Sequence, residues 1–390
     1  MAAALSPAVQ AARLLPDGLL RRLLPARMEF DGAEAHPLVF PEGSVRLFIG
    51  PANFAGQGWA WARAAERLPG VGAVSMASFG AGGYGFAVDQ AVPASVFLLS
   101  RRWERSQRRA LLERATHVII ESGRALLAGD ARVGDEIETL RAAGVKVALL
   151  GHGSDVRDGR RHASSFEESP YRDEEWGQRA GTERASEAHR ELFRAVGVPL
   201  FVSTPGLLDD VPGATWLPVV VDPLRWASER IPLSGAVEPP LVVHAPSSPV
   251  LKGTGLIEPV LEGLVGEGLI RYRRLTGVPA DHMPSAFAEA DIVLDQFRLG
   301  DYGVAACEAM AAGRIVIGNV HDDARARVRA STGLDLPVVQ ARAEEVGSTI
   351  RGLLSEPAAA RVVAARGPLF VEAAHDGRLA AEALRSFLRS

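Results

Sequence analysis

Short apolar runs alternate with segments of helical periodicity along most of the chain. The runs are rich in β-branched residues and almost continuously apolar, as parallel strands are when helices bury both of their faces. Amphipathic stretches long enough for a helix lie between them, which indicates repeated strand–helix–strand units. In the first half we expect strands at 45–49, 73–79, His117–Glu121, 145–150, 200–203 and 216–221.

Proline interrupts this pattern near the middle of the chain. Prolines cluster between 218 and 240, where helical periodicity is weak, and this stretch is the best candidate for a linker. A second series of expected strands follows at Leu241–His244, 269–275, 292–295, Ile315–Gly318 and 336–339. The pattern predicts an α/β protein with two Rossmann-like parallel-sheet domains, residues 1–222 and 223–370, and a C-terminal helix within 371–390 that packs back on the first domain. Ligands of such sheets bind beyond the carboxyl ends of the strands, so a cleft between the domains is the expected site.

Composition agrees with this organisation and excludes some partners. The 390 residues exceed the size at which one hydrophobic core usually stops growing. A formal net charge of −4 argues against nucleic acid as the main partner, because neutralising phosphates requires a basic surplus. Cys307 is the only cysteine, so no intrachain disulfide is possible, and we expect a reducing, cytoplasmic location. No stretch approaches the roughly 20 apolar residues that a membrane span requires.

Residues 14–28 form a leucine-rich segment that also carries Arg21, Arg22 and Arg27. A basic amphipathic turn of this kind suits an anionic membrane surface, so peripheral membrane contact is one interpretation. A mobile leader, or a segment packed on the first domain, is the other.

A glycine motif at 80–85 is a weak signal. It reads G-A-G-G-Y-G after an expected strand and matches G-x-G-x-x-G. A dinucleotide site also needs a helix that begins at this turn, and the residues at 86–93 predict an extended segment instead. We therefore expect a flexible loop here and no nicotinamide or flavin cofactor.

The strongest chemical signal is the sequence L-G-D-Y-G-V-A-A-C-E-A-M-A-A-G at 299–313. An expected strand leads into a short glycine-containing loop and then into a helix that begins near Val304. Backbone N–H groups of the first helical turn, around Gly303, suit an anion such as a phosphate. Glu308 lies one turn further on, where its carboxylate can accept hydrogen bonds from vicinal hydroxyls. A phosphate next to a diol describes a nucleotide, whereas an exposed glutamate on an ordinary helix is the alternative.

This segment resembles the retaining GT-B glycosyltransferases often called group 1 or family 4. Their phrase is similar to E-x-F-G-x-x-x-x-E-A-M-A-x-G-x-P-V-I, and this chain reads G-D-Y-G-V-A-A-C-E-A-M-A-A-G-R-I-V-I from 300 to 317. The resemblance gives Glu308 the ribose-binding role. It also places Tyr302 on the donor side, beside the first helical turn around Gly303 that suits a phosphate. The family's first glutamate, which usually contacts the donor sugar, falls on Gly300. Either Asp301 takes over that role from a shifted loop, or donor recognition is atypical.

A second stretch that resembles the family lies at 243–255. The family has G-R-x-x-x-x-K-G after a strand, and Lys252 matches the lysine that meets the donor diphosphate. The family's arginine is missing, and Ser247 lies in its neighbourhood. A solvated lysine at a helix start is the alternative for Lys252. The resemblance also assigns Gly277 to the region that lines the base pocket.

The first domain contributes a loop at 50–58 between a strand and a helix. In the fold that the resemblance implies, a glycine-rich loop here meets the donor phosphates and sugar, and Gly56 allows close backbone approach. We expect Gln57 on the donor side and Asn53 on the acceptor side. An ordinary strand-to-helix loop is the alternative.

Another polar group, at 151–157, follows the expected central strand directly. His152 suits a hydrogen bond to a sugar hydroxyl, and the family often has a histidine at this point. Asp155 is expected to orient the acceptor or to pair with Arg157. The charged excursion at 159–183 is expected to form a lid on the acceptor side.

Together these signals predict a glycosyltransferase that moves a sugar from a nucleoside diphosphate to an acceptor of unknown class. No D-x-D and no metal-ligand spacing occurs, so we expect no metal and no cofactor other than the donor substrate. The expected catalytic residues are His152, Lys252 and Asp301. A non-catalytic GT-B module that binds a nucleotide or glycan is the rival interpretation, because the missing arginine and first glutamate are both donor-side losses. A sugar-nucleotide epimerase on the same fold is a third.

Overall fold

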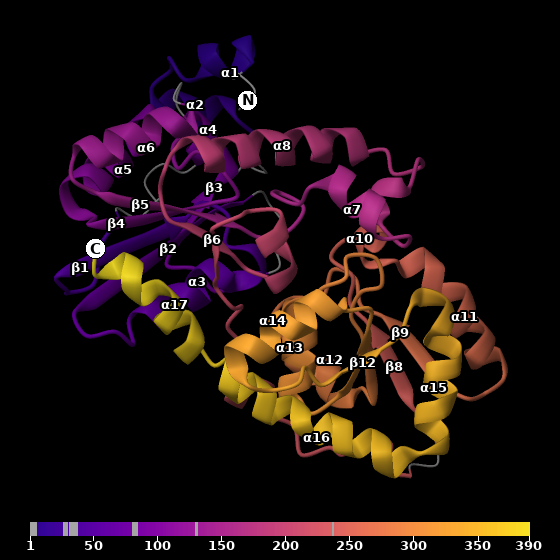
Figure 1. Ribbon diagram of the computed structural model, residues 1–390. Helices are drawn as coiled ribbons and strands as arrows, with labels where there is room; N and C mark the ends of the chain where they lie inside the picture. The colour runs from indigo at the N-terminus through magenta and orange to yellow at the C-terminus, as the bar shows by residue number, and fades with distance from the viewer. Residues whose placement is uncertain (1–5, 26–29, 31–37, 80–84, 129–131, 236–237) are drawn as a thin grey trace.

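The computed structural model describes residues 6–25, 30, 38–79, 85–128, 132–235 and 238–390. Two open parallel sheets form separate layers, each covered by helices (Figure 1). The first sheet has the strand order β3-β2-β1-β4-β5-β6-β7 and the second has β12-β11-β10-β8-β9. Neighbouring described strands pair in parallel in both sheets. The expected α/β class with two Rossmann-like domains is confirmed.

The first sheet and its helices occupy the first half of the chain. Its strands are β1 Val45–Gly50, β2 Val71–Phe79, β3 Gln90–Pro93, β4 His117–Glu121, β5 Lys146–Gly151, β6 Leu200–Val202 and β7 Thr215–Trp216. The helices up to β7 are α1 Pro7–Ala12, α2 Asp17–Leu23, α3 Gln57–Ala65, α4 Ala94–Leu99, α5 Arg101–Arg114, α6 Val133–Ala142, α7 Gly159–Ser165 and α8 Arg179–Ala195. Short 3-10 turns are η2 Phe54–Gly56, η3 Pro170–Arg172 and η4 Pro205–Asp209.

The second sheet follows the proline-rich stretch. Its strands are β8 Leu241–His244, β9 Arg271–Arg274, β10 Ile292–Leu294, β11 Ile315–Gly318 and β12 Val338–Gln340. The remaining helices are α9 Pro223–Trp226, α10 Pro249–Lys252, α11 Thr254–Gly266, α12 Met283–Glu289, α13 Val304–Ala311, α14 Asp322–Thr332, α15 Val346–Ser355, α16 Pro357–Ala374 and α17 Arg378–Leu388, with the 3-10 turn η5 Ala343–Glu345. Over the described residues, no helix combines the length and apolar character that crossing a bilayer demands.

The core of the first domain centres on β1 and β4. Every residue of β4 is buried, and its apolar side chains alternate between two hydrophobic clusters, with Val118 on one face and Ile119 on the other. Burying one such side chain stabilises a fold by roughly 1.5–3 kcal/mol, so a strand covered on both faces must be apolar throughout. The continuous apolar runs of the sequence therefore mark the central strands.

The sheet edges differ most from expectation. The expected strand at 216–221 pairs only over β7, and Leu217 then donates its N–H to Val202 before the chain leaves the sheet. The segment at 86–93 is extended as expected, and its last part pairs with β2 as β3. The motif residues 80–84 lie outside the described residues.

The C-terminal segment divides into two helices where a single one was expected over 371–388. The break lies at 375–377, where Gly377 has a φ of +98°. His375 explains it: its carbonyl accepts the Val221 N–H at 2.8 Å and its Nδ1 lies 2.8 Å from the Val219 carbonyl. α16 thus ends in the second domain, and α17 packs against α3 of the first, with the Phe387 ring 5.1 Å from His117 (Figure 1).

The N-terminal segment packs on the first domain through α1 and α2. Arg13 is buried, forms an ion pair with Glu104 and donates to the Leu98 carbonyl at 2.6 Å. Leu20 is 1% exposed, whereas Leu14 is 68% exposed. The packed interpretation of residues 14–25 is therefore what the structure shows, and residues 26–28 of this segment lie outside the described residues.

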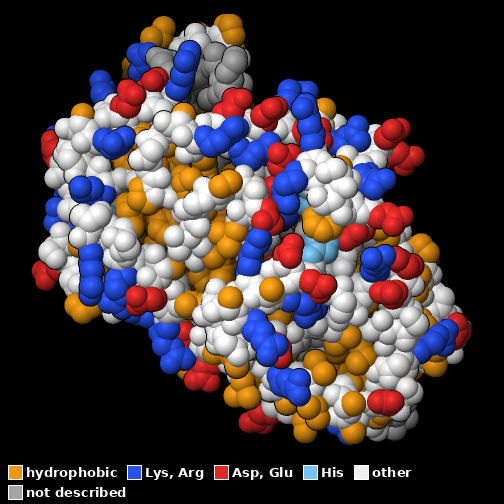
Figure 2. All heavy atoms as spheres, in the orientation of Figure 1, with side chains coloured by type: hydrophobic (Ala, Val, Ile, Leu, Met, Phe, Trp, Pro, Cys, Tyr) orange, Lys and Arg blue, Asp and Glu red, His pale blue; other side chains and the backbone are white. Residues whose placement is uncertain are grey.

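The excursion at 159–183 connects the two domains. Glu168 lies 2.7 Å from His321 Nε2 and accepts from the Asn319 amide at 2.9 Å, and Asp173 accepts from Arg298 at 2.9 Å. In Figure 2, acidic, basic and histidine side chains crowd this junction. The middle of the excursion, from 168 to 173, is thus held on the second domain by hydrogen bonds and ion pairs. Its last residues belong to α8.

Candidate functional site

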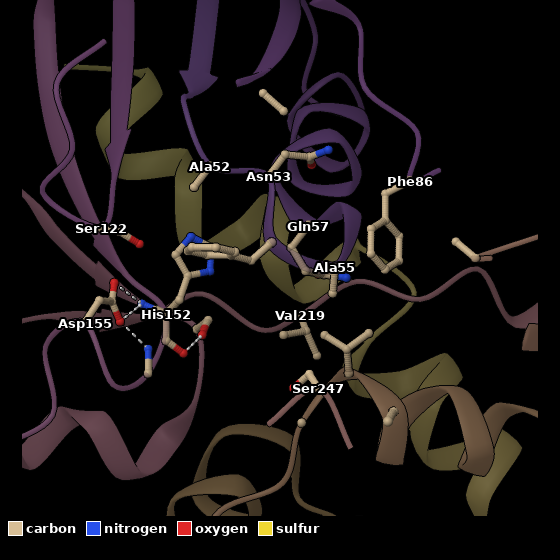
Figure 3. Close-up of a pocket in the computed structure, with 18 of the residues that line it drawn as sticks. Ala52, Asn53, Ala55, Gln57, Phe86, Ser122, His152, Asp155, Val219 and Ser247 are labelled. Carbon is tan, nitrogen blue, oxygen red and sulfur yellow. Dashed lines mark hydrogen bonds between the residues drawn. The ribbon is translucent and has the colours of Figure 1, made fainter. Parts of the chain in front are cut away.

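A large cavity lies between the carboxyl ends of the two sheets, with a volume of about 1150 Å³. It is lined by loops that follow β1, β4, β5 and β6 of the first domain, and β8 and β9 of the second, together with α8 and α13. Pockets for a single small ligand usually measure about 300–1,000 Å³, so this cavity has room for two. Figure 3 shows the part of it around His152, with Ser247 of the second domain on the opposite side.

Glu308 lies on α13 with its side chain at the cavity wall. No hydrogen bond to its carboxyl group is formed within the described part of the chain. Burial raises the pKa of Glu308 to about 8, and the positive charge of Arg225 opposes this rise. The site therefore holds a desolvated carboxyl group whose ionised form would be stabilised by hydroxyl donors.

The first turn of α13 also lines the cavity, through Gly303 and Val304. N–H groups in the first turn of a helix lack partners within the helix and favour an anion. One of these groups is already satisfied, because the Gly303 N–H donates to Asp295 Oδ2 at 3.1 Å. The other oxygen of Asp295 accepts from Lys252 Nζ at 2.8 Å.

Asp295 was not anticipated as a site residue. It is 4% exposed and directly follows β10, and it accepts the N–H of the cavity-lining Gly303. Because Asp295 holds Lys252, the lysine reaches the cavity already paired with a carboxylate. The signal available in the sequence was an acidic residue immediately after a buried strand.

Asp301 and Tyr302 lie away from the cavity wall. Asp301 is 4% exposed and accepts from the Gly206 N–H at 2.9 Å, which joins the two domains. Desolvation raises its pKa. The Tyr302 hydroxyl lies 3.2 Å from His375 Nε2 in a buried contact. The structure therefore places Asp301 at the domain interface, a position that its place in the motif did not indicate.

Gly300 explains why the first glutamate of the family phrase has no counterpart here. Its φ is +67°, a conformation that glycine adopts readily. A Cβ at this position would lie 1.9 Å from the His321 ring. A glutamate cannot occupy this place unless the loop and His321 both move.

Ser247 and Gly277 line the second-domain side of the cavity, as expected. Apolar residues also line this side of the cavity, and these include Pro246, Val278 and Met283. Gly56 is set back from the wall: its φ is +73°, and a Cβ there would contact the Phe86 ring at 3.4 Å.

His152 is the best positioned polar side chain of the first domain. Its Nε2 lies 3.0 Å from Glu121 Oε1, and Phe54 packs edge-on against its ring with 5.0 Å between centroids. Glu121 is fully buried, and its second oxygen accepts the N–H groups of Ala52 and Asn53 at 2.9 Å. Glu121 thus fixes the ring of His152 and leaves Nδ1 as the nitrogen available to a ligand. The acidic residue at the end of β4 was the one signal of this pair in the sequence.

The other polar residues expected here serve mainly to hold the loops. Asn53 accepts from the Trp59 N–H at 2.9 Å and Gln57 bonds both ways with the Val220 backbone, at 2.7 and 3.1 Å. Asp155 accepts the His152 N–H at 3.0 Å (Figure 3). These three residues line the cavity, whereas Arg157 is 4% exposed and lies outside the lining. Among the described residues, no group of three or more His, Cys, Asp or Glu side chains is arranged to hold a metal ion.

Comparisons with known proteins bear on the fold. No protein-family model matches the chain, and no curated protein matches it in sequence. Among solved structures it is similar to sucrose-phosphate synthase from Thermosynechococcus elongatus, with 13% identity and a TM-score of 0.59 over 88% of this chain and 98% of that one. It is also similar to an alpha-glucosyltransferase solved with UDP-glucose and DNA containing an abasic site, with 10% identity and a TM-score of 0.58 over 89% and 99%.

A third similar structure is Anabaena HepE in complex with UDP-glucose, with 10% identity and a TM-score of 0.55 over 88% of this chain and 99% of that one. Similarity at this level of identity shows a shared fold. The chain therefore has the GT-B fold of these glycosyltransferases over nearly its whole length, as the sequence phrase predicted.

Proposed function

We propose that this protein is a glycosyltransferase that takes a sugar from a nucleoside diphosphate. The observation that carries the proposal is the convergence of Lys252, the first turn of α13 and Glu308 on one wall of the interdomain cavity. The GT-B fold supports it, because structures with this fold hold UDP-glucose. Fold alone does not fix an activity, so the argument rests on these groups.

In this proposal the donor lies along the second-domain wall. The diphosphate meets the helix N-terminus at Val304 and the ammonium group of Lys252, which stabilise the charge that grows on the leaving group. The ribose hydroxyls donate to Glu308. The base lies against the apolar surface around Gly277. The same groups neutralise the departing diphosphate, so the reaction proceeds without a metal ion.

The sugar then lies between the domains, near His152. The bond between its anomeric carbon and the diphosphate oxygen breaks, and an acceptor oxygen bonds to the same carbon with retention of configuration. The acceptor proton passes to the departing diphosphate. His152, held by Glu121, accepts a hydrogen bond from a sugar hydroxyl through Nδ1. The expected catalytic role of Asp301 has no place in this scheme, because its carboxylate accepts the Gly206 N–H at the domain interface and positions the two domains.

A nucleotide- or glycan-binding module is the second candidate function. The ion pair between Lys252 and Asp295 favours it, because a paired lysine offers less net charge to a leaving group. An epimerase would use the same donor pocket but would change the sugar and not transfer it.

One experiment separates these functions. The full chain is incubated with UDP-, GDP-, ADP- and TDP-sugars. Thermal stabilisation is measured first. Release of the nucleoside diphosphate is measured next, with glucose, glucose 6-phosphate and glucuronate as acceptors and with water alone. If the protein is a transferase, one donor raises its melting temperature and its nucleoside diphosphate is released. K252Q should lower that turnover by about 100-fold, which is the scale of one lost transition-state contact. R271Q, at an exposed arginine of the same domain, is the control. Binding without release across all donors would support the module, and a changed sugar on the intact nucleotide would support the epimerase.

We propose further that the outer face of the N-terminal segment, whose inner face packs on the first domain, contacts an anionic membrane surface. Leu14, Leu19 and Leu23 are 68%, 41% and 63% exposed, and Arg22 of α2 is exposed on the same short segment. Co-sedimentation with vesicles containing phosphatidylglycerol should fall several-fold in L14S/L23S. L224S alters a leucine that is 86% exposed in α9, and it should bind vesicles as the unchanged protein does. Equal binding by all three proteins would exclude this contact.

A further inference from the structure

The loop that follows β4 forms a separate corner of the cavity, on the first-domain side. Ser122 and Gly123 both adopt left-handed backbone conformations, with φ of +55° and +56°. For a serine this conformation costs about 1–2 kcal/mol. It is held by the Ser122 N–H, which donates to the Leu150 carbonyl at 2.7 Å. Residues kept in such conformations cluster at binding sites.

The Ser122 hydroxyl is a hydrogen-bond donor that a ligand could use. The residue is 1% exposed, and its hydroxyl has no hydrogen-bond partner within the described residues. It lines the cavity, and Figure 3 shows the hydroxyl directed toward the side where His152 lies. A buried hydroxyl without a partner costs roughly 1–3 kcal/mol, so an acceptor atom supplied by a ligand would be favourable.

Arg124, two residues later, brings a positive charge to the same corner. Its guanidinium lies over the Phe54 ring, 5.0 Å from the centroid, and the side chain lines the cavity. In the described part of the chain, no carboxylate pairs with it. The aromatic ring fixes the plane of the guanidinium and leaves its N–H groups for a ligand.

His189 completes the corner from α8. A Cβ on Gly123 would lie 2.8 Å from the His189 ring, so the loop and this histidine are in contact. His189 Nδ1 donates to the Asp155 carbonyl at 3.0 Å, so Nε2 of the neutral ring is left as a hydrogen-bond acceptor. Thr182 and His189 line the cavity from one face of α8.

The carboxylates nearest to this corner are already occupied. Glu121 uses one oxygen for His152 and the other for two backbone N–H groups. Asp155 accepts the backbone N–H groups of His152 and Gly153. The corner thus presents the Arg124 cation and the Ser122 hydroxyl as donors while its acidic groups are satisfied, which suits an anion.

We propose that Arg124 and Ser122 bind an anionic group, a phosphate or a carboxylate, carried by the acceptor, and that His189 Nε2 accepts a hydrogen bond from one of its hydroxyls. The inference rests on the proposed function and names its acceptor class: a sugar or polyol with such a group. The arginine binds two oxygens of the anion side by side, and the Ser122 hydroxyl donates to one of them. The acceptor's reactive hydroxyl then points toward His152 and the donor sugar.

The test is a set of titrations of the full chain, by calorimetry, with glucose 6-phosphate, glucuronate and glucose. Each is measured with saturating UDP and without nucleotide. We expect at least one anionic sugar to bind ten or more times more tightly than glucose, and the two anions distinguish phosphate from carboxylate. R124Q should remove that preference, and S122A should lower the affinity for the anionic sugar several-fold. R109Q, at an α5 arginine whose side chain is 78% exposed, should keep it.

Three outcomes would overturn the inference. They are equal affinity for glucose and both anions, an equal loss of anion binding in R109Q, and a loss of UDP affinity in R124Q with the anion preference intact. If R124Q does not fold, R124K and S122A are titrated in its place, and an unchanged affinity for the anionic sugar in both variants would overturn the inference. If UDP and all nucleotide-sugars fail to bind, the proposed donor is rejected. The anion preference is still measured in that case, because one set of titrations contains no nucleotide.

Discussion

Lys252 and Glu308, two of the residues expected on the donor side, both bring little net charge to the cavity. Lys252 is paired with buried Asp295, and the carboxyl group of Glu308 is desolvated. Charge at the donor wall is therefore nearly balanced before a ligand arrives. In the proposed function, the diphosphate competes with Asp295 for the lysine, and the ribose favours the ionised form of the glutamate.

The Lys252–Asp295 pair makes a testable claim about affinity. D295N removes the competing charge while its amide oxygen can still accept the Gly303 N–H. UDP should then bind about tenfold more tightly, the change that 1.4 kcal/mol produces. Calorimetric titration measures it, and D281N, at an exposed aspartate of the same domain, is the control. Weaker binding in D295N would mean that Asp295 is needed to hold Lys252 in place.

Glu308 makes the stability of the ligand-free protein depend on pH. Its pKa is raised to about 8 in the folded chain, so between about pH 4.5 and 8 the folded form keeps a proton that the unfolded form releases. This lowers stability as pH rises through that window. E308Q should therefore raise the melting temperature by an amount that grows from pH 5.5 to 8 and then levels off. E289Q, at an exposed α12 carboxyl group, should show no such trend, and a constant difference for E308Q would contradict the raised pKa.

At the level of elements, the loop between β10 and α13 has a shape that depends on Gly300, whose φ is +67°. Gly300 lies against His321, which stacks on Phe166 at 3.7 Å and bonds to Glu168. A side chain at 300 would displace the histidine and disturb the bridge between the domains. The ring of His321 therefore connects the excursion at 159–183 with the loop that leads into α13.

G300A should destabilise the protein more than its left-handed backbone alone explains. G268A is the matched control, because Gly268 has a φ of +71° and no atom lies within 4 Å of the added Cβ. We expect G268A to cost about 1 kcal/mol and G300A roughly 2–4 kcal/mol, since the second also meets His321. Urea unfolding of both variants measures the difference. Equal costs would show that the loop relaxes without moving His321.

At the scale of the whole molecule, buried hydrogen bonds join the domains beside the cavity. His162 is fully buried and spans them, with Nδ1 2.7 Å from Ser169 Oγ and Nε2 3.3 Å from the Leu299 carbonyl. Burial lowers the pKa of His162 to about 3, and the charge of Arg157 adds to this effect. Protonation of this ring is thus unfavourable in the folded protein.

The junction should therefore weaken in mild acid. Below the ordinary histidine pKa of about 6.5, the unfolded chain takes up a proton that folded His162 excludes, so stability falls as pH falls from 6.5 toward 3. At pH 5 the loss from this residue is about 2 kcal/mol. H162N should show a smaller drop than the unchanged protein between pH 7 and 5 in urea unfolding. H282N, at an exposed histidine, is the control, and parallel pH profiles for the unchanged protein and H162N would refute the claim.

The sequence by itself determined the two parallel α/β domains and the elements that carry Glu308 and Lys252. These features are local: strands such as β4 must be apolar because both faces are buried, and the helix after Gly303 begins where glycine and good helix formers meet. Tertiary structure decided where Asp301, Glu121, Asp295 and Ser122 point. Asp301 meets a backbone N–H 95 residues away in sequence, and Glu121 meets a ring 31 residues away. No local pattern encodes such pairings, because they depend on how two sheets and their loops pack around one cavity.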